Sequence, residues 1–204
     1  MMEQGSPEWF EARLGRVTAS RISDVMMSPT TKGYQNYRAE LVCERLTGEP
    51  VEKYVSAAML HGTETEPQAR AFYELETGLD VIQTGFITHP SIAMSGASPD
   101  GLIGSDGGLE IKCPQMSNHI KILTGGEIDD AYMLQMQWGM ECTDREWWDF
   151  VSFCPSFPCE LQMHRQRIRR DDPLIEKIRA KVTTILEEVD DLEIRLSHKM
   201  QEAA

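Results

Sequence analysis

The sequence predicts an α/β protein in which a central β-sheet is flanked by helices and a long helix ends the chain. Up to Gly78, apolar residues recur mainly at helical spacing. After Gly78 the chain changes to short β-prone runs separated by Gly, Pro, Asp and Ser. From about residue 172, a single apolar stripe at helical spacing continues almost to the C-terminus.

Length and composition indicate one domain. The chain has 204 residues, of which 41% are hydrophobic and 26% charged, and no linker-like segment divides it. We therefore expect a single domain over residues 1–204. No apolar stretch approaches the ~20 residues of a membrane span, and the N-terminus lacks the pattern of an export signal. We expect a cytoplasmic protein with no membrane contact.

The five cysteines form no CxxC pair, and their odd number argues against a closed disulfide framework. We expect free thiols. Some nucleases carry four-cysteine iron–sulfur clusters, but the spacings in this chain match no compact ligand set.

Four helices are expected before the sheet. Ser6 and Pro7 have the form of an N-cap followed by proline in the first turn, and Gly15 acts as a stop signal. Thr18 is placed to cap the second helix, and glycines close the third and fourth. The expected ranges are 7–14, 18–26, 37–46 and 63 or 66 to 77, with a polar loop at 27–36.

Five β-prone runs then form the expected sheet, in the segments 81–90, 91–101, 109–113, 147–154 and 160–169. A helix is expected to cross between the third and fourth runs, at about 126–141. The final helix carries a stripe made of Leu174, Ile178, Val182, Ile185, Val189, Leu192 and Leu196. This stripe could pack on its own core or on a neighbouring subunit.

The segment SPDGLIGSDGGLEIKCP, residues 98–114, holds the most informative chemistry. Successive side chains of a strand point to opposite faces, so Glu110 and Lys112 share the face opposite Leu109 and Ile111. A hairpin through the glycine-rich turn would bring Asp100 beside Glu110. Carboxylates with backbone carbonyls and water are the ligands of Mg²⁺ or Mn²⁺, and a lysine near the metal could orient an attacking water. This arrangement suits hydrolysis of a phosphodiester.

A solvated strand edge is the alternative reading, because Glu–Lys pairs and PDG turns are common. The combination of Pro99-Asp100 with Glu110-Ile111-Lys112 nevertheless resembles the PD-(D/E)xK pattern of nucleases with a restriction-endonuclease-like core, a central mixed β-sheet flanked by helices.

Longer segments make this resemblance more specific. Residues 9–26, 60–74, 98–114 and 131–138 are similar to the ordered motifs of the phage lambda exonuclease group, within the YqaJ-type viral recombinase family. The resemblance covers about residues 7–153. It implies a Mg²⁺-dependent exonuclease that digests the 5′-ended strand of linear double-stranded DNA, forms a homotrimer ring and works beside a single-strand DNA annealing protein. Mn²⁺ is the expected substitute metal.

The resemblance also assigns roles within the site. Asp100, Glu110 and the Ile111 carbonyl match metal ligands, Lys112 matches the catalytic lysine, and Glu66 matches a helical acid that completes the metal site. Thr63 and Glu66 also have the spacing of a capping box, and Pro67 is typical of a helix start, so a structural role for Glu66 is the alternative.

Three further positions match residues that hold the 5′ phosphate or assist catalysis. Arg13 and Ser20 match 5′-phosphate-binding residues, and a helix opening at Thr18 would offer backbone N–H groups to an anion. A surface arginine and a plain N-cap are the alternative. Gln135 resembles a glutamine that could orient Lys112 or the water, although it could be buried and structural, or confused with Gln137.

Other features leave choices open. The net charge of −13 argues weakly against a nucleic-acid partner, unless positive charge is confined to a channel. The arginines within residues 165–170 could line such a channel or cover a sheet edge. An endonuclease with the same core, and a non-catalytic DNA clamp or recombination scaffold, are the rival functions.

Overall fold

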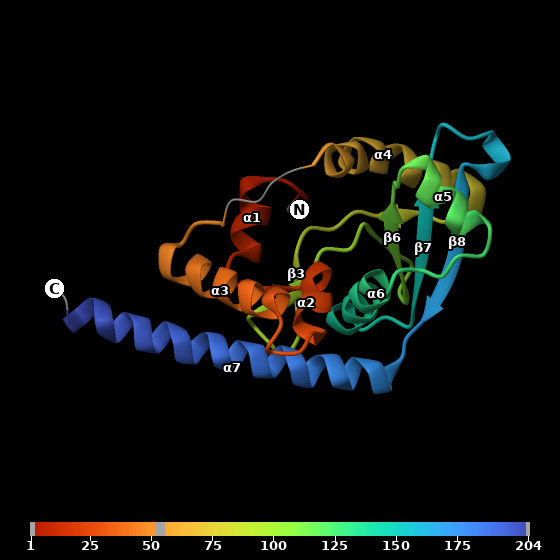
Figure 1. The fold of residues 1–204 in the computed structure, drawn as a ribbon. Coiled ribbons are helices and arrows are strands. Elements are labelled where there is room, and N and C mark those ends of the chain that lie inside the picture. The colour runs from red at the N-terminus through yellow and green to blue at the C-terminus, as the bar shows by residue number, and fades with distance from the viewer. Residues whose placement is uncertain (1–2, 52–55, 203–204) are drawn as a thin grey trace.

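The computed structural model describes residues 3–51 and 56–202 and shows helices packed around two β-sheets (Figure 1). The helices are α1 (Pro7–Arg13), α2 (Ile22–Met26), α3 (Lys32–Thr47), α4 (Ala57–Thr77), α5 (Met116–Leu123), α6 (Asp130–Thr143) and α7 (Asp172–Glu202). Two short 3₁₀ helices are η1 (Ala19–Arg21) and η2 (Cys159–Leu161). The strands are β1 (Val17–Thr18), β2 (Val81–Ile82), β3 (Ile87–Thr88), β4 (Ser95–Ala97), β5 (Gly101–Ile103), β6 (Gly107–Lys112), β7 (Trp147–Phe153) and β8 (Met163–Arg169).

The larger sheet is mixed, as the sequence predicts. Its order is β2-β5-β6-β7-β8, in which β6 and β7 are parallel and the other neighbours are antiparallel. The expected single sheet is nevertheless divided, because β1, β4 and β3 form a separate three-stranded sheet. The glycines of the turn segment also form more strand than expected, since β5 and β6 pair directly as a hairpin.

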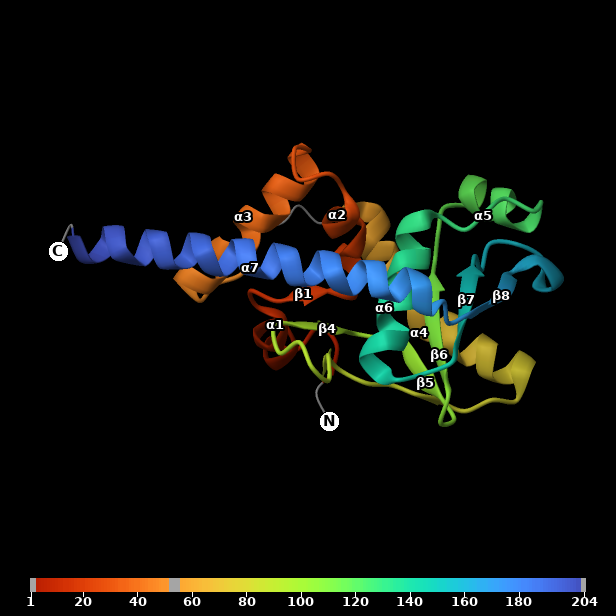
Figure 2. The ribbon, with the colours of Figure 1, turned by 90° about the horizontal axis from the view of Figure 1, so that it is seen from below.

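Helices cover both faces of the larger sheet, so its alternating side chains enter two different cores (Figure 2). On one face, Leu109, Ile111 and Val151 pack against Ala69 and Tyr73 of α4. On the opposite face, residues of β7 and β8 pack against α6. A third core joins α2, α3, α6 and α7 beside the smaller sheet. Both faces of β6 are therefore covered, including the face that carries the charged pair.

The start of α4 differs from the sequence prediction. The helix begins at Ala57, where the Ser56 side chain accepts from the Met59 amide, so Pro67 lies inside the helix. Proline removes one backbone donor there, but a buried face with Ala69 and Tyr73 at 0% exposure stabilises the helix through this break. The capping box is also absent, because the Thr63 hydroxyl donates to the Met59 carbonyl.

Three other helical segments also differ from the sequence prediction. The segment after Thr18 is a single 3₁₀ turn followed by the five-residue α2, and Thr18 forms no side-chain capping bond. Helix α3 begins at Lys32, five residues before the expected start, because Thr31 caps it. Helix α5 was not expected, since its eight residues are too few for a clear periodic pattern.

Helix α7 confirms the predicted apolar stripe and packs along α2, α3 and α6 (Figure 2). Val182, Ile185 and Val189 are fully buried, whereas Leu196 is 37% exposed toward the helix end. No helix in residues 3–51 and 56–202 is both long and apolar enough to cross a membrane.

Two glycines of β6 allow the sheet to accept two tryptophans. Gly107 and Gly108 lie in register with Trp147 and Trp148, whose buried rings turn to opposite faces. A Cβ at Gly108 would overlap the Trp148 ring.

We expect Gly108→Val to lower the free energy of unfolding by about 2–3 kcal/mol, because the tryptophan must leave its packed position. Gly62→Ala is the control: Gly62 lies in α4 with open space where a Cβ would be added, so this change should stabilise the protein by about 0.5–1 kcal/mol. Urea unfolding followed by tryptophan fluorescence measures both. Equal stability of Gly108→Val and the parent would contradict this packing.

Candidate active site

The β5–β6 hairpin brings Asp100 beside the charged pair of β6. Gly101 pairs with Leu109, so Asp100 lies at the start of β5 opposite the middle of β6. The Asp100 Oδ2 accepts from the Ile111 backbone N–H at 2.7 Å. Glu110 is only 2% exposed, and its Oε1 lies 2.6 Å from the Lys112 Nζ. The predicted convergence of these three side chains is therefore present.

Helix α6 covers the pair and contributes two side chains. The Gln135 Nε2 donates to the Glu110 Oε1 at 2.6 Å, and the Lys112 Nζ lies 4.7 Å from the centre of the Tyr132 ring. Gln137 instead donates to the Arg169 carbonyl and accepts from the Asp171 amide. The structure thus distinguishes the two glutamines: only Gln135 contacts the acidic cluster.

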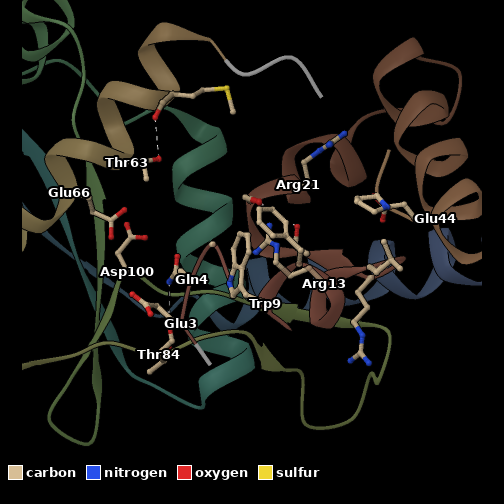
Figure 3. A pocket seen from close by; sticks show the side chains of 18 of the residues that line it. Glu3, Gln4, Trp9, Arg13, Arg21, Glu44, Thr63, Glu66, Thr84 and Asp100 are labelled. Atoms are coloured by element: carbon tan, nitrogen blue, oxygen red, sulfur yellow. Dashed lines mark hydrogen bonds between the residues drawn. The ribbon is translucent and has the colours of Figure 1, made fainter. Parts of the chain in front are cut away.

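Helix α4 brings Glu66 to the same group. Figure 3 shows the Glu66 and Asp100 carboxylates next to one another. Arg70, one turn further along α4, bonds the Glu66 carboxylate and donates through Nε to the Asp100 carbonyl at 3.2 Å. Arg70 therefore joins the helix to the start of β5. This arginine was not identified from the sequence, because its partner at Asp100 is 30 residues away and becomes adjacent only in the fold.

Burial and mutual repulsion raise the pKa values of the acids. Burial, followed by the charge of Asp100, raises the pKa of Glu66 to about 7. Burial also raises the pKa of Glu110 to about 7 against the opposing effect of Lys112, and it raises the pKa of Asp100. Burial disfavours the Lys112 ammonium, but Glu110 and Asp100 outweigh this and raise its pKa. The three carboxylates therefore carry more potential negative charge than the neighbouring Lys112 and Arg70 can balance.

The donor chemistry fits a divalent cation. Three carboxylates that are short of positive charge are hard oxygen donors of the kind that Mg²⁺ and Mn²⁺ prefer. Within the described ranges, no three His, Cys, Asp or Glu side chains are already spaced as a metal-binding group. The carboxylates are turned toward protein donors instead: Glu110 toward Lys112 and Gln135, and Glu66 toward Arg70.

A cavity of about 1150 Å³ connects this acidic group with α1 and η1. Glu66 and Asp100 line one side and Arg13 lines another (Figure 3). Thr18 and Ser20 also line this cavity. The residues expected to bind a 5′ phosphate and two of the expected metal ligands therefore face a common space, although they come from segments almost ninety residues apart.

Arg13 is a partly buried cation that forms no ion pair with a carboxylate of the described residues. Its Nη1 donates to the Ser98 hydroxyl at 2.9 Å, and its guanidinium lies 4.2 Å from the Trp9 ring centre. No ion pair joins Arg13 to any described residue, whereas Arg21 on the same cavity is paired with Asp24 at 2.7 Å. Burial lowers the pKa of Arg13 to about 10, which still leaves it charged. Nothing in the sequence indicates that Ser98 would bond Arg13, although Ser98 adjoins the Pro99-Asp100 motif.

The turn after Arg13 is held from α3. Gly15 has a φ of +63°, a left-handed conformation that glycine adopts without strain. Its N–H donates to the Glu44 Oε2 at 2.8 Å, and its carbonyl accepts from the Arg45 Nε at 3.0 Å. Both backbone groups of this turn are thus fixed, which fixes the end of the helix that carries Arg13.

Thr18 precedes the short 3₁₀ helix η1 and not the regular helix that the sequence predicts, and its side chain forms no capping bond. The Thr18 N–H donates to the Tyr37 Oη at 3.3 Å, so it is already satisfied inside the protein. Its hydroxyl lies 3.4 Å from that of Ser20, which is exposed. Any anion at this position would meet hydroxyl groups and Arg13 rather than a regular helix N-terminus.

Comparison with family models and known structures places this chain among nucleases. The model of the YqaJ-like viral recombinase domain matches residues 8–146. Crystal structures of LHK-Exo, an alkaline exonuclease from Laribacter hongkongensis, include one in complex with dAMP. Their sequence is 47% identical to this chain, with a TM-score of 0.92, and the match covers 98% of this chain and 100% of LHK-Exo.

A second solved structure supports the fold. The phage-related exonuclease from Haemophilus somnus 129PT has a TM-score of 0.73 at 17% identity, and the match covers 89% of this chain and 96% of that one. No protein in the search of curated sequences matches this chain.

The raised carboxyl pKa values predict a pH-dependent stability. Between the ordinary value of 4.5 and about 7, the folded protein keeps protons on Glu66 and Glu110 that the unfolded chain releases. These groups therefore lower the free energy of unfolding as pH rises through this window. In Glu66→Gln/Glu110→Gln the loss between pH 5 and 8 should be smaller than in the parent. Urea unfolding with a metal chelator present measures it, and identical pH profiles would contradict it.

Proposed function

The chain belongs to the YqaJ-like viral recombinase family, and we propose that it is a Mg²⁺-dependent exonuclease that digests the 5′-ended strand of linear double-stranded DNA, leaving a 3′ single-stranded tail. Family membership and the likeness to an alkaline exonuclease support a nuclease that acts on DNA in recombination. One observation carries the finer proposal: a single cavity has carboxylates at one side and, at another, a partly buried arginine that forms no ion pair with the described residues.

In this proposal Asp100, Glu110, Glu66 and the Ile111 carbonyl would hold the metal. A bound divalent cation supplies Lewis-acid polarisation of the scissile phosphate. Glu110 keeps Lys112 in its ammonium form, so Lys112 orients the attacking water and does not act as a base. Gln135 helps to fix the Glu110 carboxylate, because it donates to the same oxygen that Lys112 contacts.

Arg13 supplies the anchor for the DNA end. A terminal 5′ phosphate would give this partly buried guanidinium an anionic partner, with the Ser20 and Ser98 hydroxyls as further donors. Water attacks the next phosphorus and the bond to the 3′ oxygen breaks. The 3′ oxygen takes up a proton and the water gives one to solvent. The released 5′-mononucleotide is of the chemical class of dAMP, which LHK-Exo binds, and the shortened strand again ends in a 5′ phosphate.

The homotrimer ring, the annealing protein as partner and the cytoplasmic location stay predictions from the resemblance and the sequence. A ring around the duplex would explain processive digestion, because the enzyme could not diffuse away between successive cuts.

Removing any of three groups should abolish digestion. We expect Asp100→Asn, Glu110→Gln and Lys112→Ala each to lower the turnover of a linear duplex by at least ~10³-fold, because phosphodiester hydrolysis is very slow without metal and its ligands. Chelation should stop the parent enzyme, and Mg²⁺ or Mn²⁺ should restore it. Glu127→Gln, an exposed acid outside the site, is the control. Full activity in any of the three would remove that residue from the mechanism.

The end anchor predicts a preference for phosphorylated ends. A 5′ phosphate should speed digestion of a linear duplex by roughly 10- to 100-fold over a 5′ hydroxyl, the value of one or two charge-assisted hydrogen bonds. Arg13→Gln should remove this preference, whereas Arg16→Gln, the same charge change on the same cavity, should keep it. Strand-specific end labels identify the polarity. A sealed circular duplex should remain intact; cutting of the circle would indicate an endonuclease.

A further inference from the structure

The edge strand β8 displays a row of arginines on one face. Arg165, Arg167 and Arg169 alternate along the strand and are all exposed. β8 is the outermost strand of the larger sheet (Figure 1). The chain has only 20 basic residues against 33 acidic ones, and four of the 20 lie within residues 165–170. Such a concentration of positive charge stands out on a protein with a net charge of −13.

The middle arginine of the row is held rigidly. The Arg167 guanidinium donates to both Asp149 oxygens, at 2.8 and 2.9 Å, and lies 3.5 Å from the Trp147 ring centre. The Tyr73 hydroxyl donates to the same Asp149 carboxylate at 2.7 Å, and Arg165 lies 3.7 Å from it. Asp149 is fully buried and neutralises one charge, so the row retains two net positive charges.

The neighbouring Arg170 serves the fold instead. It turns to the opposite side and pairs with Glu141 and Asp172. Arg169, in contrast, forms no side-chain ion pair with any residue of the described ranges, and the side chains of Arg165 and Arg167 are 46% and 39% exposed. The structure therefore separates one structural arginine from three that face solvent.

The row has the length and chemistry to follow a DNA backbone. The four residue steps from Arg165 to Arg169 span about 13 Å of strand, while a duplex carries one negative charge per ~1.7 Å of axis. Arginine presents planar donors that suit phosphate oxygens. Protein partners would be expected to bring apolar contacts as well, yet β8 exposes no large hydrophobic side chain among its described residues. These features favour a nucleic-acid backbone over an acidic protein segment.

The row also lies within reach of the candidate active site. Tyr73, which supports Arg167 through Asp149, is seven residues from Glu66 on α4, or about 10 Å along the helix. We propose that Arg165, Arg167 and Arg169 form a second, sequence-independent DNA-binding surface that holds the backbone of the duplex while its 5′ end is in the active site. This inference rests on the proposed exonuclease function.

The experiment compares two double variants with equal charge change. Arg165→Gln/Arg169→Gln removes the outer arginines and leaves Arg167, so Asp149 keeps its partner. Lys177→Gln/Lys181→Gln on the exposed side of α7 is the control. Affinity for a 5′-phosphorylated duplex is measured by fluorescence anisotropy without divalent metal, between about 50 and 200 mM KCl. The arginine variant should bind roughly 10-fold more weakly at low salt, and its log–log salt slope should be smaller by about 2.

Each outcome decides a separate question. If the arginine variant, shown to be folded by its thermal melting, binds and digests DNA like the lysine control, the second surface is refuted and the exonuclease proposal stands. The row would then serve an acidic protein partner or protect the sheet edge. If the parent binds DNA in a row-dependent way but fails to digest it with Mg²⁺, the surface stands and the exonuclease proposal fails.

Discussion

The structure depends on the burial of like charges that the protein only partly neutralises. Glu110 is almost fully enclosed between the sheet and α6, and its only cationic neighbour within bonding distance among the described residues is Lys112. Asp100 and Glu66 add negative charge from the hairpin and from α4. Gathering carboxylates in a poorly hydrated place destabilises the fold and is tolerated where function needs it. The surrounding donors, Gln135, Arg70 and the Ile111 amide, limit this cost while leaving the cluster short of positive charge.

On the other side of the cavity it is a positive charge that lacks a full set of partners. Arg13 is partly buried, and its direct side-chain partners among the described residues are a hydroxyl and an aromatic ring, so it too is incompletely neutralised. An acidic group and a basic group are thus kept apart across one cavity instead of pairing with one another. The Gly15 turn, fixed by Glu44 and Arg45, holds the end of the helix that carries Arg13. A molecule with a net charge of −13 can in this way present a local positive field to the end of a polyanion.

Much of this could be predicted from the sequence, because strand alternation and hairpin return are local rules. They place Glu110 and Lys112 on one face and Asp100 beside them, as the structure shows. The helix start of α4 was predicted wrongly, because Pro67 is a strong local signal that the buried face of a 21-residue helix overrides. Ser98 and Arg70 could not be identified, since their roles arise from contacts between segments 85 and 30 residues apart. The division into two sheets likewise depends on packing, and no local pattern encodes it.

The pairing of the arginines separates structural roles from binding roles. Because acids outnumber bases by 33 to 20, a folded chain of this composition offers a carboxylate to almost any arginine that needs one. Arg21, Arg45, Arg70, Arg170 and Arg179 all take such partners and join elements of the fold. Arg13 and Arg169 form no ion pair within the described residues, and Arg165 only shares a carboxylate that Arg167 already engages. Arg16, Arg145 and Arg195 also form no ion pair in this part of the chain, but each donates to backbone carbonyls of the chain itself. Among the described residues Arg13 donates only to a hydroxyl and the Arg169 side chain forms no hydrogen bond, so these two guanidiniums keep donors free for an anion from outside the chain.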